Sequence, residues 1–590
     1  MDLFNDIDDT AALLAALPAR ISAIPRHWAA RTPHAPALRD GARQLSYAAL
    51  AGAVDAAAAR LRALGLRPGD RLLVVGENCL EQVVLCFAAA SIDAWIVLVN
   101  SRLSAPELDQ ILAHSGARRV LYTAAEAAEA AAHGRRHGAL PARSLGGGDG
   151  HAAGLGPNGD GGQAAAAAPD RRNACGAAGA AFDALERCLV GPLDEGCAAA
   201  PVQAGGAGQA AALVYTSGTT GQPKGVMLSH RNLLYIAAVS STLRGLRPQD
   251  RAYGVLPISH VYGLASVMLG TLYAGACLQL AARFSPQALL AAVRDDGLTI
   301  VQGVPAMYAR LLAALGGAAG PAGAPLPSRL RFIYAGGSPL TPSLKADVER
   351  LFGLPLHNGY GMTESAPTIS QTSLAAPRAD TSVGLEIPGV QTRVVDADGA
   401  DAAPGAVGEL WVRGPNVMLG YYREAAMTAQ VLRPGGWLDT GDLARRDADG
   451  ALFIAGRSKE LIIRSGFNVY PLEVETVLNA HPAVTQSAVV GRDAADGDEE
   501  VVAFVEIDPH HAVADDVANG AADGAAESAA DGAPHGALRR ALHAHLAGAL
   551  APYKLPAQIV VMTALPAAAS GKVLKGRLRE LAQGLPRAGD

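Results

Sequence analysis

The stretch of sequence that decides the fold is Tyr215-Thr216-Ser217-Gly218-Thr219-Thr220-Gly221-Gln222-Pro223-Lys224-Gly225. Its glycines allow backbone N–H groups to turn inward without Cβ clashes, and its hydroxyls are short hydrogen-bond donors for phosphate oxygens. Its single lysine adds a compact positive charge. Apolar residues flank the stretch at Ala211–Tyr215 and Val226–Leu228, so an ordinary Gly/Thr hairpin turn is the less favoured interpretation. The stretch therefore predicts a loop that wraps a polyphosphate, in a protein that uses ATP.

The loop differs from the Walker A phosphate loop. That pattern has a lysine directly after its last glycine and a Ser or Thr after the lysine. Here Pro223 precedes the lysine and Gly225 follows it. The sequence therefore predicts a different kind of phosphate-binding loop.

Length, charge and cysteine usage narrow the class of protein. The 590 residues exceed what one hydrophobic core usually holds, so we expect at least two domains and a buried active site. The net charge of −6, without a long Lys/Arg block, gives no basic surface for nucleic acid. Six cysteines without CxxC spacing argue against a zinc site or a disulfide framework. The acidic N-terminus lacks a secretory signal pattern, so we expect a cytoplasmic protein.

Two apolar segments are candidates for membrane spans. Val83–Asn100 is interrupted by Asp93, whereas Leu264–Ala282 is free of charge for 19 residues, which reaches transmembrane length. The second segment carries glycines and polar side chains, so its apolar content is modest for a helix that faces lipid. We interpret both segments as buried pieces of helix and strand. A membrane span, and peripheral association through an oily substrate, stay as alternatives.

Helical and strand patterns alternate between Leu45 and Thr123. A helical period covers Tyr47–Leu64, and short β-rich runs occur at Arg71–Val75 and Trp95–Val99. This alternation predicts an α/β sheet with parallel strands.

Two Ala/Gly-rich segments interrupt the regular patterns, at about residues 124–210 and 509–536. They contain few large apolar side chains, so burial cannot offset the entropy of ordering them. We therefore expect disordered or loosely helical inserts. The second segment contains His510, His511 and His535, which we interpret as solvated rather than metal-bound.

The rest of the chain changes character twice. The α/β alternation resumes between the inserts through Leu351, and residues 383–453 are rich in strand patterns. A hinge is expected at Gly456–Lys459, followed by a compact unit. The elements expected in this unit are a helix at Pro471–Leu478, strands near Thr485–Val490 and Glu500–Ile507, and a helix at Leu538–Leu550.

Seven further motifs follow the phosphate loop. They are Leu256–Gly263, Tyr334–Ser338, Asn358–Glu364, Gly408–Leu410, Gly436–Asp442, the segment from Gly456-Arg457 to Pro471–Glu475, and Ser570–Lys572. In this order and spacing they resemble the adenylate-forming (AMP-binding) superfamily of acyl-CoA synthetases, nonribosomal adenylation domains and beetle luciferases. The resemblance extends from about Leu45 to Lys575, apart from the two inserts. It is specific, because eight ordered motifs seldom arise by chance.

The sequence pattern and the resemblance together predict an α/β protein with two domains. The first is a large N-terminal domain of stacked α/β sheets with a β subdomain, at residues 1–455. The second is a small, mobile α+β C-terminal domain at residues 460–590. Residues 456–459 are the predicted hinge.

The resemblance implies ATP, Mg²⁺ and CoA as cofactors and a carboxylic acid as the small-molecule partner, while the oligomeric state stays open. A carboxylate is a poor electrophile, so such an enzyme first makes an acyl adenylate on the α-phosphorus of ATP and releases pyrophosphate. Glu364, preceded by Thr363, would bind the Mg²⁺ that bridges phosphate oxygens; a solvated loop acid is the alternative. The residues implied to hold the β- and γ-phosphates are Thr216, Ser217, Gly218, Thr219, Thr220, Gly221 and Lys224.

The resemblance also implies a nucleoside site. Tyr360 would stack on adenine, and Asp442 would accept both ribose hydroxyls with assistance from Arg457. A buried core tyrosine and a turn-capping aspartate are the alternatives. The residues implied for this site are Gly336, Gly337, Asn358, Gly359, Tyr360, Gly361, Asp442 and Arg457.

Lys572 is the lysine implied to carry the first half-reaction. Its ammonium, placed between the substrate carboxylate and the α-phosphate, would offset charge as the two anions meet, whereas a surface lysine is the alternative. Ala567–Ala569 replaces a more polar family stretch, which leaves the anchoring of this loop open. In the family the C-terminal domain then rotates, which implies a hinge at Lys459 and a CoA tunnel along the Gly466 backbone. The implied catalytic residues are Lys572, His260, Thr219 and Glu364.

The predicted acyl pocket is open and uncharged. Acetate-activating relatives carry a Trp at the position of Gly361, so this glycine leaves the pocket open. We found no Lys or Arg among the lining candidates to pair a second carboxylate, so we expect a fatty or aryl monocarboxylic acid rather than malonate, succinate or an amino acid. His260 would position the carboxylate, or it is a packed core histidine. The other lining candidates are Val261, Gly303, Val304, Ala335, Gly336 and Ser365.

The leading hypothesis is a fatty or aromatic acid–CoA ligase that forms AMP and pyrophosphate. The first alternative is an enzyme that loads its acyl group on a carrier protein, although no carrier domain follows Lys572. The second is a non-catalytic nucleotide-binding relative. It would predict damage at Lys224, Glu364, Asp442 or Lys572, and none is visible.

Overall fold

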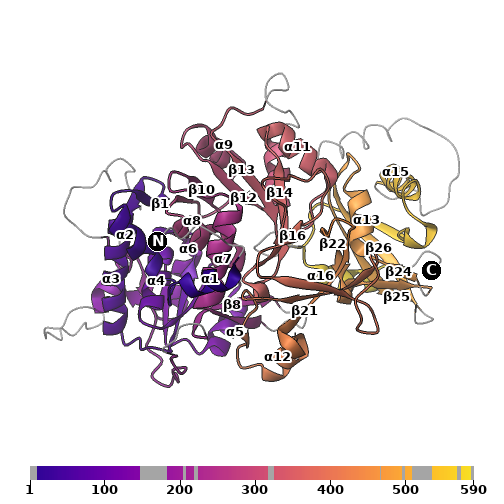
Figure 1. The fold of residues 1–590 in the computed structure, drawn as a ribbon. Helices are drawn as coiled ribbons and strands as arrows, with labels where there is room; N and C mark the ends of the chain where they lie inside the picture. The colour runs from indigo at the N-terminus through magenta and orange to yellow at the C-terminus, as the bar shows by residue number, and fades with distance from the viewer. Residues whose placement is uncertain are drawn as a thin grey trace, which may run out of the picture.

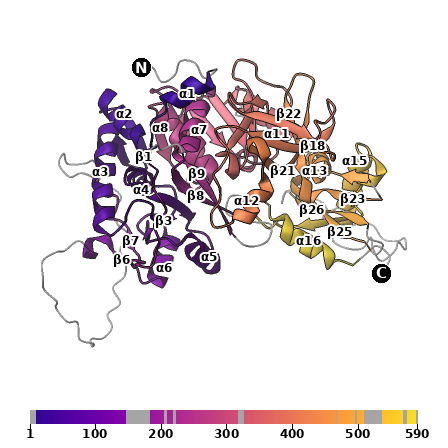
Figure 2. The ribbon, with the colours of Figure 1, turned by 60° about the horizontal axis from the view of Figure 1, so that its bottom comes forward.

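The computed structural model describes residues 9–145, 182–203, 208–217, 223–315, 325–465, 467–494, 498–507, 535–567 and 573–586. The N-terminal helices lie at one end of the molecule and a C-terminal α/β unit lies at the other (Figure 1). A view turned by 60° keeps this order, with the strands of the middle third of the chain between the two ends (Figure 2).

One sheet contains the predicted parallel strands. β3 runs parallel to β4 and to β5, which confirms the predicted α/β arrangement. β8 is parallel to β4 and antiparallel to β9, so the phosphate stretch lies in a hairpin. The order across this sheet is β19 (Gly420–Tyr421), β9 (Pro223–Ser229), β8 (Ala210–Ser217), β4 (Trp95–Asn100), β3 (Arg71–Gly76), β5 (Arg119–Tyr122), β7 (Leu189–Val190) and β6 (Leu140–Pro141).

A second sheet carries the predicted nucleoside motifs. Its central strands, from β14 to β1, are parallel, and β13 and β14 end at Gly336 and Gly361. Ligands of open α/β sheets bind outside such carboxyl ends. The order is β16 (Leu385–Glu386), β15 (Thr368–Gln371), β14 (Leu356–Gly361), β13 (Phe332–Gly336), β12 (Ile300–Gly303), β10 (Arg251–Gly254), β11 (Cys277–Leu280), β1 (Pro36–Asp40) and β2 (Arg43–Ser46).

Residues 383–453 are rich in strands, as predicted. In their main sheet β18 pairs with β17 and β21, and β21 also pairs with β20 and β22, all antiparallel. The bounds of these strands are Gln391–Val395 for β17, Val407–Arg413 for β18, Leu432–Arg433 for β20, Trp437–Arg446 for β21 and Leu452–Arg457 for β22.

The C-terminal unit has an apolar core of its own, which includes Val474, Val505 and Leu542. The predicted helix at Pro471–Leu478 and the two predicted strands are confirmed. The elements of this unit are β23 (Ile462–Arg464), β24 (Phe467–Val469), α13 (Pro471–Leu478), β25 (Val484–Asp493), β26 (Glu499–Ile507), α15 (Gly536–Ala547), β27 (Gln558–Met562) and α16 (Lys575–Gln583).

The two long apolar segments are buried elements of the N-terminal sheets. The first forms most of α4 (Leu80–Ser91) and β4, and every residue from Leu80 to Ala90 is buried. The second forms η2 (Tyr262–Leu269), which is a π-helix, then α8 (Gly270–Tyr273) and β11. Among the described residues no helix is long and apolar enough to cross a membrane.

The predicted inserts are narrower than expected. Residues 128–145 contain α6 (Ala128–Arg136), β6 and η1 (Ala142–Leu145), and β7 pairs with both β5 and β6. The expectation of disorder is therefore wrong at these edges, because Leu185 and Cys188 are buried side chains that a composition average hides. Residues 146–181 and 508–534 lie outside the described part of the chain, with His510 and His511.

The other helices cover the sheets. The predicted helix at Tyr47–Leu64 is confirmed as α3 (Tyr47–Ala63). The remaining ones are α1 (Thr10–Ala16), α2 (Ala23–Arg31), α5 (Ala105–Ser115), α7 (His230–Leu243), α9 (Pro286–Arg294), α10 (Pro305–Ala314), α11 (Pro342–Phe352), α12 (Ala425–Val431), and the short turns η4 (Thr363–Ser365), η5 (Pro434–Gly436), η6 (Ser458–Glu460) and η7 (Pro552–Lys554).

Two glycines of the η2–α8 segment make a matched pair for testing this packing. A Cβ on Gly263 would lie 2.2 Å from the carbonyl oxygen of Pro257, whereas a Cβ on Gly270 would lie 3.7 Å from its nearest neighbour. We expect Gly263→Ala to lower the free energy of unfolding by about 2 kcal/mol or more, because the backbone must move. Gly270→Ala should leave it unchanged or raise it by up to about 1 kcal/mol. Urea unfolding midpoints of both variants check this, and equal midpoints would contradict the described packing.

Candidate active site

The β8–β9 hairpin holds the ends of the polyphosphate loop. Thr216 lies opposite Lys224 in the register of the two strands, and Ser217 ends β8. The two predicted phosphate contacts on either side of the loop are therefore neighbours. Residues 218–222 lie outside the described part of the chain and include the predicted Gly218, Thr219, Thr220 and Gly221.

β19 brings a tyrosine to this hairpin. Tyr421 lies opposite Val226 in the antiparallel pairing of β19 with β9. Lys224 Nζ is 5.5 Å from the centre of the Tyr421 ring, and the Tyr421 hydroxyl donates a hydrogen bond of 2.7 Å to Glu364 Oε1. Burial, and then the Glu364 carboxylate, raise the pKa of Tyr421, so the hydroxyl keeps its proton and stays a donor. One aromatic ring therefore connects the predicted phosphate lysine to the predicted metal-binding carboxylate.

Glu364 lies in the η4 turn directly after β14, and it is 8% exposed. This burial excludes the alternative of a solvated loop acid. In the part of the chain that the structure describes, no three His, Cys, Asp or Glu side chains converge on a common metal position. Mg²⁺ is commonly held by one or two carboxylates together with substrate phosphates and water. A single buried carboxylate beside a polyphosphate hairpin fits that kind of magnesium binding.

A second cluster joins three predicted nucleoside residues. Asp442 lies opposite Arg457 in the pairing of β21 with β22, and Arg457 Nε is 3.0 Å from Asp442 Oδ1. The Tyr360 hydroxyl donates a hydrogen bond to Asp442 Oδ2. Burial, and then the Asp442 charge, raise the pKa of Tyr360, while the same carboxylate raises the pKa of Arg457. Asp442 is 4% exposed, so the carboxylate sits in a fixed, largely desolvated position.

Arg457 connects the two clusters electrostatically. The Glu364 charge adds to the rise in the pKa of Arg457, and the Arg457 charge opposes the rise in the pKa of Tyr421. Arg457 therefore interacts favourably with Glu364 in addition to its ion pair with Asp442. The arrangement can hold a polyanion on one side and a hydroxylated sugar on the other.

Glycine is needed at the ends of β13 and β14 for different reasons. Gly337 adopts a φ of +84°, a conformation that favours glycine. A Cβ on Gly361 would lie 1.8 Å from the carbonyl oxygen of Pro367, so the close approach of two backbone segments requires glycine there. Gly361 therefore has a packing cause in addition to the open acyl pocket that the sequence predicts.

The Asn358 side chain anchors the strand that carries Tyr360. Its Nδ2 donates to the carbonyl oxygens of Thr381 and Ser382, at 3.1 and 3.2 Å. Its Oδ1 accepts the Gly359 N–H at 2.9 Å. The amide thus fixes the end of β14 below the tyrosine ring.

His260 is exposed on the segment that follows β10, which excludes the alternative of a packed core histidine. Its Nδ1 accepts the Tyr262 N–H at 3.2 Å, so the neutral ring carries its proton on Nε2. Lys459 lies exposed in η6. Gly466 and Lys572 lie outside the described residues.

Lys575, at the start of α16, is a site-associated residue that the motifs did not indicate. Its Nζ is 2.9 Å from Glu460 Oε2 and 2.8 Å from Glu475 Oε1. Burial lowers the pKa of Lys575, but the two carboxylates more than offset it and raise the pKa. Glu460 directly follows Lys459, so this double ion pair ties the predicted hinge to α13 and α16. The motifs did not indicate Tyr421 either. The local sequence signal for Tyr421 is its position after Gly420, and the signal for Lys575 is its closeness in sequence to Lys572.

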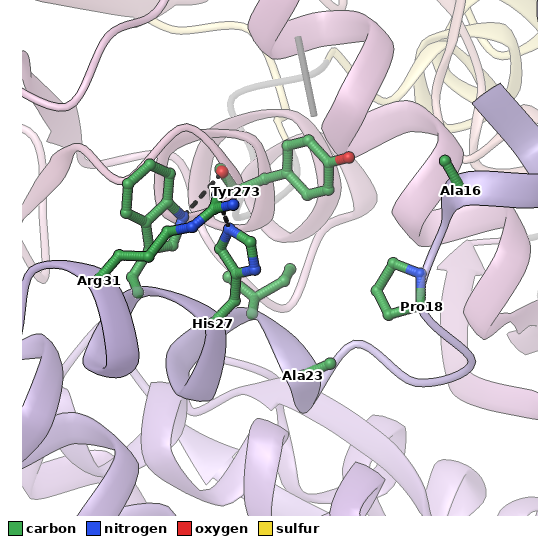
Figure 3. A pocket seen from close by; sticks show the side chains of 8 residues that line it. Ala16, Pro18, Ala23, His27, Arg31 and Tyr273 are labelled. Carbon is green, nitrogen blue, oxygen red and sulfur yellow. Dashed lines mark hydrogen bonds between the residues drawn. The ribbon is translucent and has the colours of Figure 1, made fainter. Parts of the chain in front are cut away.

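A cavity of about 270 Å³ lies apart from these residues, between the N-terminal helices and α8. His27 Nε2 is 2.6 Å from Arg31 Nη1, and the Trp28 ring N–H donates to the carbonyl oxygen of Tyr273 at 3.0 Å (Figure 3). Burial, and then the Arg31 charge, lower the pKa of His27. None of the predicted site residues lines this cavity, so it is not the candidate active site.

Comparison with known families identifies the two parts of the chain. Residues 25–422 match the model of the AMP-binding enzyme family, and residues 473–572 match that of the AMP-binding enzyme C-terminal domain. A feruloyl-CoA synthase from an Amycolatopsis species is 34% identical over 566 residues, which are 94% of this chain and 97% of that protein. An indoleacetate–CoA ligase from Aromatoleum aromaticum is 32% identical over 95% of this chain and 97% of its own length.

Solved structures agree with this assignment. ATP-bound MatB from Rhodopseudomonas palustris is similar with a TM-score of 0.73 and 28% identity, over 96% of this chain and 99% of that one. The o-succinylbenzoate CoA synthetase of Bacillus subtilis, in complex with ATP and magnesium, is similar with a TM-score of 0.70 and 26% identity, over 94% and 98%. This chain belongs to the AMP-binding enzyme family and is an ATP-dependent acyl- or aryl-CoA ligase.

Proposed function

We propose that this ligase activates an aromatic carboxylic acid, first to an acyl adenylate with release of pyrophosphate and then to a CoA thioester with release of AMP. The observation that supports the first half-reaction is the cluster of Arg457 and Tyr360 around the buried Asp442, together with the Lys224–Tyr421–Glu364 group. The aromatic choice rests on relatives named for feruloyl and indoleacetate substrates. It narrows the fatty or aryl acid expected from sequence.

In this proposal the hairpin residues bind the triphosphate and the strand ends bind the nucleoside. Thr216, Ser217, residues 218–221 and Lys224 hold the β- and γ-phosphates. Glu364 holds Mg²⁺, which supplies charge neutralisation at the phosphate oxygens. Tyr360, anchored through its hydroxyl, packs on adenine beside the backbone of Gly336, Gly337 and Gly359.

Asp442 accepts hydrogen bonds from the ribose hydroxyls, and Arg457 keeps that carboxylate ionised and oriented. His260 orients the substrate carboxylate, and Lys572 carries the charge that brings this carboxylate to the α-phosphate. The second half-reaction requires that the C-terminal domain turn about residues 456–459. We propose that Lys459 is the pivot, and that the Gly466 backbone then lines the CoA tunnel. The domains in this scheme are residues 1–455 and 460–590.

Aromatic side chains near Gly336 support an aryl substrate. The rings of Tyr262 and Tyr334 pack edge to face, with centres 6.2 Å apart. The Tyr262 hydroxyl lies 3.6 Å from the position that a Cβ on Gly336 would take. Aromatic groups prefer such edge-to-face neighbours.

AMP release with a panel of acids tests the proposal. We expect CoA-dependent AMP release with cinnamates, arylacetates or benzoates, at a kcat/KM at least about tenfold above that for octanoate or palmitate, because edge-to-face packing adds to burial. A fatty acid as the best substrate would contradict the aromatic choice but leave the ligase intact.

The same assay distinguishes CoA from a carrier protein as the acceptor of the acyl group. ATP–pyrophosphate exchange that depends on an acid, without any increase in turnover on adding CoA, would point to a carrier protein as the acceptor. In that case the tunnel at Gly466 would be withdrawn. Absence of both exchange and AMP release across the panel would favour the non-catalytic alternative.

The tyrosine that holds Glu364 can be tested against its neighbour. We expect Tyr421→Phe to raise the Mg²⁺ concentration for half-maximal ATP–pyrophosphate exchange by about tenfold, because a partner of a metal ligand typically affects metal affinity by about 10- to 100-fold. Tyr422→Phe is the matched control, since that ring packs against Trp95 and His114 instead. An equal Mg²⁺ requirement in both variants would argue against Glu364 as the metal ligand.

A further inference from the structure

A buried arginine lies next to the predicted acyl pocket without a carboxylate partner. Arg244, the C-cap residue directly after α7, is 1% exposed. Its Nη1 donates to Gln302 Oε1 at 2.6 Å, and its guanidinium lies 4.6 Å from the centre of the Tyr334 ring. Among the described residues it forms no ion pair with Asp or Glu, and its Nε is buried without a hydrogen-bond acceptor.

Among the described residues, the two other arginines that are at most 2% exposed are neutralised or saturated with acceptors. Arg71 donates to the carbonyl oxygens of Ser115, Gly116 and Ala198 at 2.8 to 3.0 Å. Arg492 is 2.5 Å from Glu500. A buried guanidinium without such compensation is costly, because desolvation is not repaid. Arg244 has the neutral side chains of Gln302 and Tyr334 as partners, including a side-chain hydrogen bond with Tyr334, so within the described residues its charge is not neutralised.

Two more buried donors near Arg244 have no partner. Gln302 Nε2 and the Tyr262 hydroxyl are buried, and neither makes a hydrogen bond within the described residues. Gln302 is 1% exposed and Tyr262 is 7% exposed. Arg244 Nε and Gln302 Nε2 can only donate a hydrogen bond, and the Tyr262 hydroxyl can donate one as well, so one acceptor group would satisfy all three. Three unsatisfied donors around one positive charge favour an anion.

The three donors are connected to the predicted acyl pocket. Gln302 directly precedes Gly303, and Tyr262 lies beside Gly336, two positions that the sequence predicts as pocket lining. The Tyr262 and Tyr334 rings are in edge-to-face contact, and Tyr334 lies against Arg244. The three donor groups therefore adjoin the predicted acyl pocket on the side of Gly303 and Gly336.

We propose that Arg244, Gln302 and Tyr262 form a subsite for a second anionic oxygen group, a carboxylate or a sulfonate, at the far end of the acid substrate. This inference rests on the proposed aryl-CoA ligase function and deepens it. It revises the expectation of a monocarboxylic substrate, which assumed that no Lys or Arg reaches the pocket. The sequence analysis did not include Arg244 among the lining candidates, because this residue follows α7 and lies outside the acyl motifs.

Three acids of one shape test the subsite, namely cinnamate, 4-carbamoylcinnamate and 4-carboxycinnamate. We expect kcat/KM for the 4-carboxy acid to exceed that for the other two by at least about tenfold, as a charged hydrogen bond predicts. Equal values for the carbamoyl and carboxy acids, both above cinnamate, would overturn the anionic group in favour of a neutral acceptor. A preference for cinnamate would overturn the subsite altogether.

Substitutions assign the preference to the named residues. In Arg244→Met the ratio of kcat/KM for 4-carboxycinnamate to that for cinnamate should fall to near 1, and Gln302→Leu should reduce it severalfold. Arg71→Met is the matched control, because Arg71 is equally buried but its acceptors are backbone carbonyls; its ratio should equal that of the wild type. An unchanged ratio in Arg244→Met would overturn the proposal. Gln302→Leu keeps the charge of Arg244, so this variant tests the proposal if Arg244→Met does not fold.

Thermal unfolding separates this role from a structural one. Removing an uncompensated buried charge should leave the melting temperature of Arg244→Met equal to or above that of the wild type, whereas Arg71→Met should melt lower. A loss in Arg244→Met as large as that in Arg71→Met would overturn the proposal in favour of a structural arginine.

Straight-chain acids distinguish this inference from the proposed function. Octanoate and octanedioate differ by one terminal carboxylate, so their ratio reports the subsite without an aromatic ring. Preference for octanedioate with no turnover of aryl acids would sustain the subsite and contradict the aryl function. If cinnamate, 4-carbamoylcinnamate and 4-carboxycinnamate are turned over with equal kcat/KM, the aryl-CoA ligase function is sustained and the subsite is overturned.

Discussion

The ion pair between Asp442 and Arg457 is the interaction on which the site depends. It exists because the antiparallel register of β21 and β22 sets the two residues opposite each other, directly before the η6 turn. The carboxylate also receives the Tyr360 hydroxyl, so a residue at the end of β14 is fixed by a strand of another sheet. The Glu364 charge also adds to the rise in the pKa of this arginine. Asp442 and Glu364 are buried, and an unpaired buried charge costs several kcal/mol, so these two carboxylates need their partners.

In the proposed function three sheets contribute to the site, because ATP has three chemically different parts. A triphosphate needs a cation beside it, and in this proposal Lys224 of the β8–β9 hairpin supplies it. A purine needs a flat aromatic neighbour beside small residues, which the ends of β13 and β14 provide. A ribose needs a fixed carboxylate, which comes from β21. The short strand β19 connects the first part to the others, since Tyr421 is paired with the hairpin strand and hydrogen-bonded to Glu364.

Much of this organisation could be predicted from the sequence, where local pattern and chemistry agree. The helix α3, the strands β3 and β4, and α13, β25, β26 and α15 of the C-terminal unit follow from short-range periodicity, whereas the β8–β9 hairpin and the strands β23, β24 and β27 were not predicted. The edges of the first Ala/Gly-rich segment could not be predicted, because their few buried side chains are diluted by composition. The sequence analysis did not identify Tyr421 and Arg244 as site residues, for another reason. Each comes from a part of the chain remote in sequence from the motif it lies beside. The pairing of β19 with β9 brings Tyr421 to the hairpin, and the hydrogen bond of Arg244 to Gln302 joins the residue after α7 to β12.

The measurement that tests the account most directly is calorimetric titration of Mg²⁺–ATP into the wild-type chain and into Asp442→Asn, without acid or CoA. The variant keeps the size of the side chain but removes the charge that pairs with Arg457 and that, in the proposed function, accepts the ribose hydroxyls. The account predicts a Kd at least about tenfold higher for the variant, from the loss of charge-assisted hydrogen bonds. An unchanged Kd in a folded variant would contradict the placement of the nucleoside at this cluster.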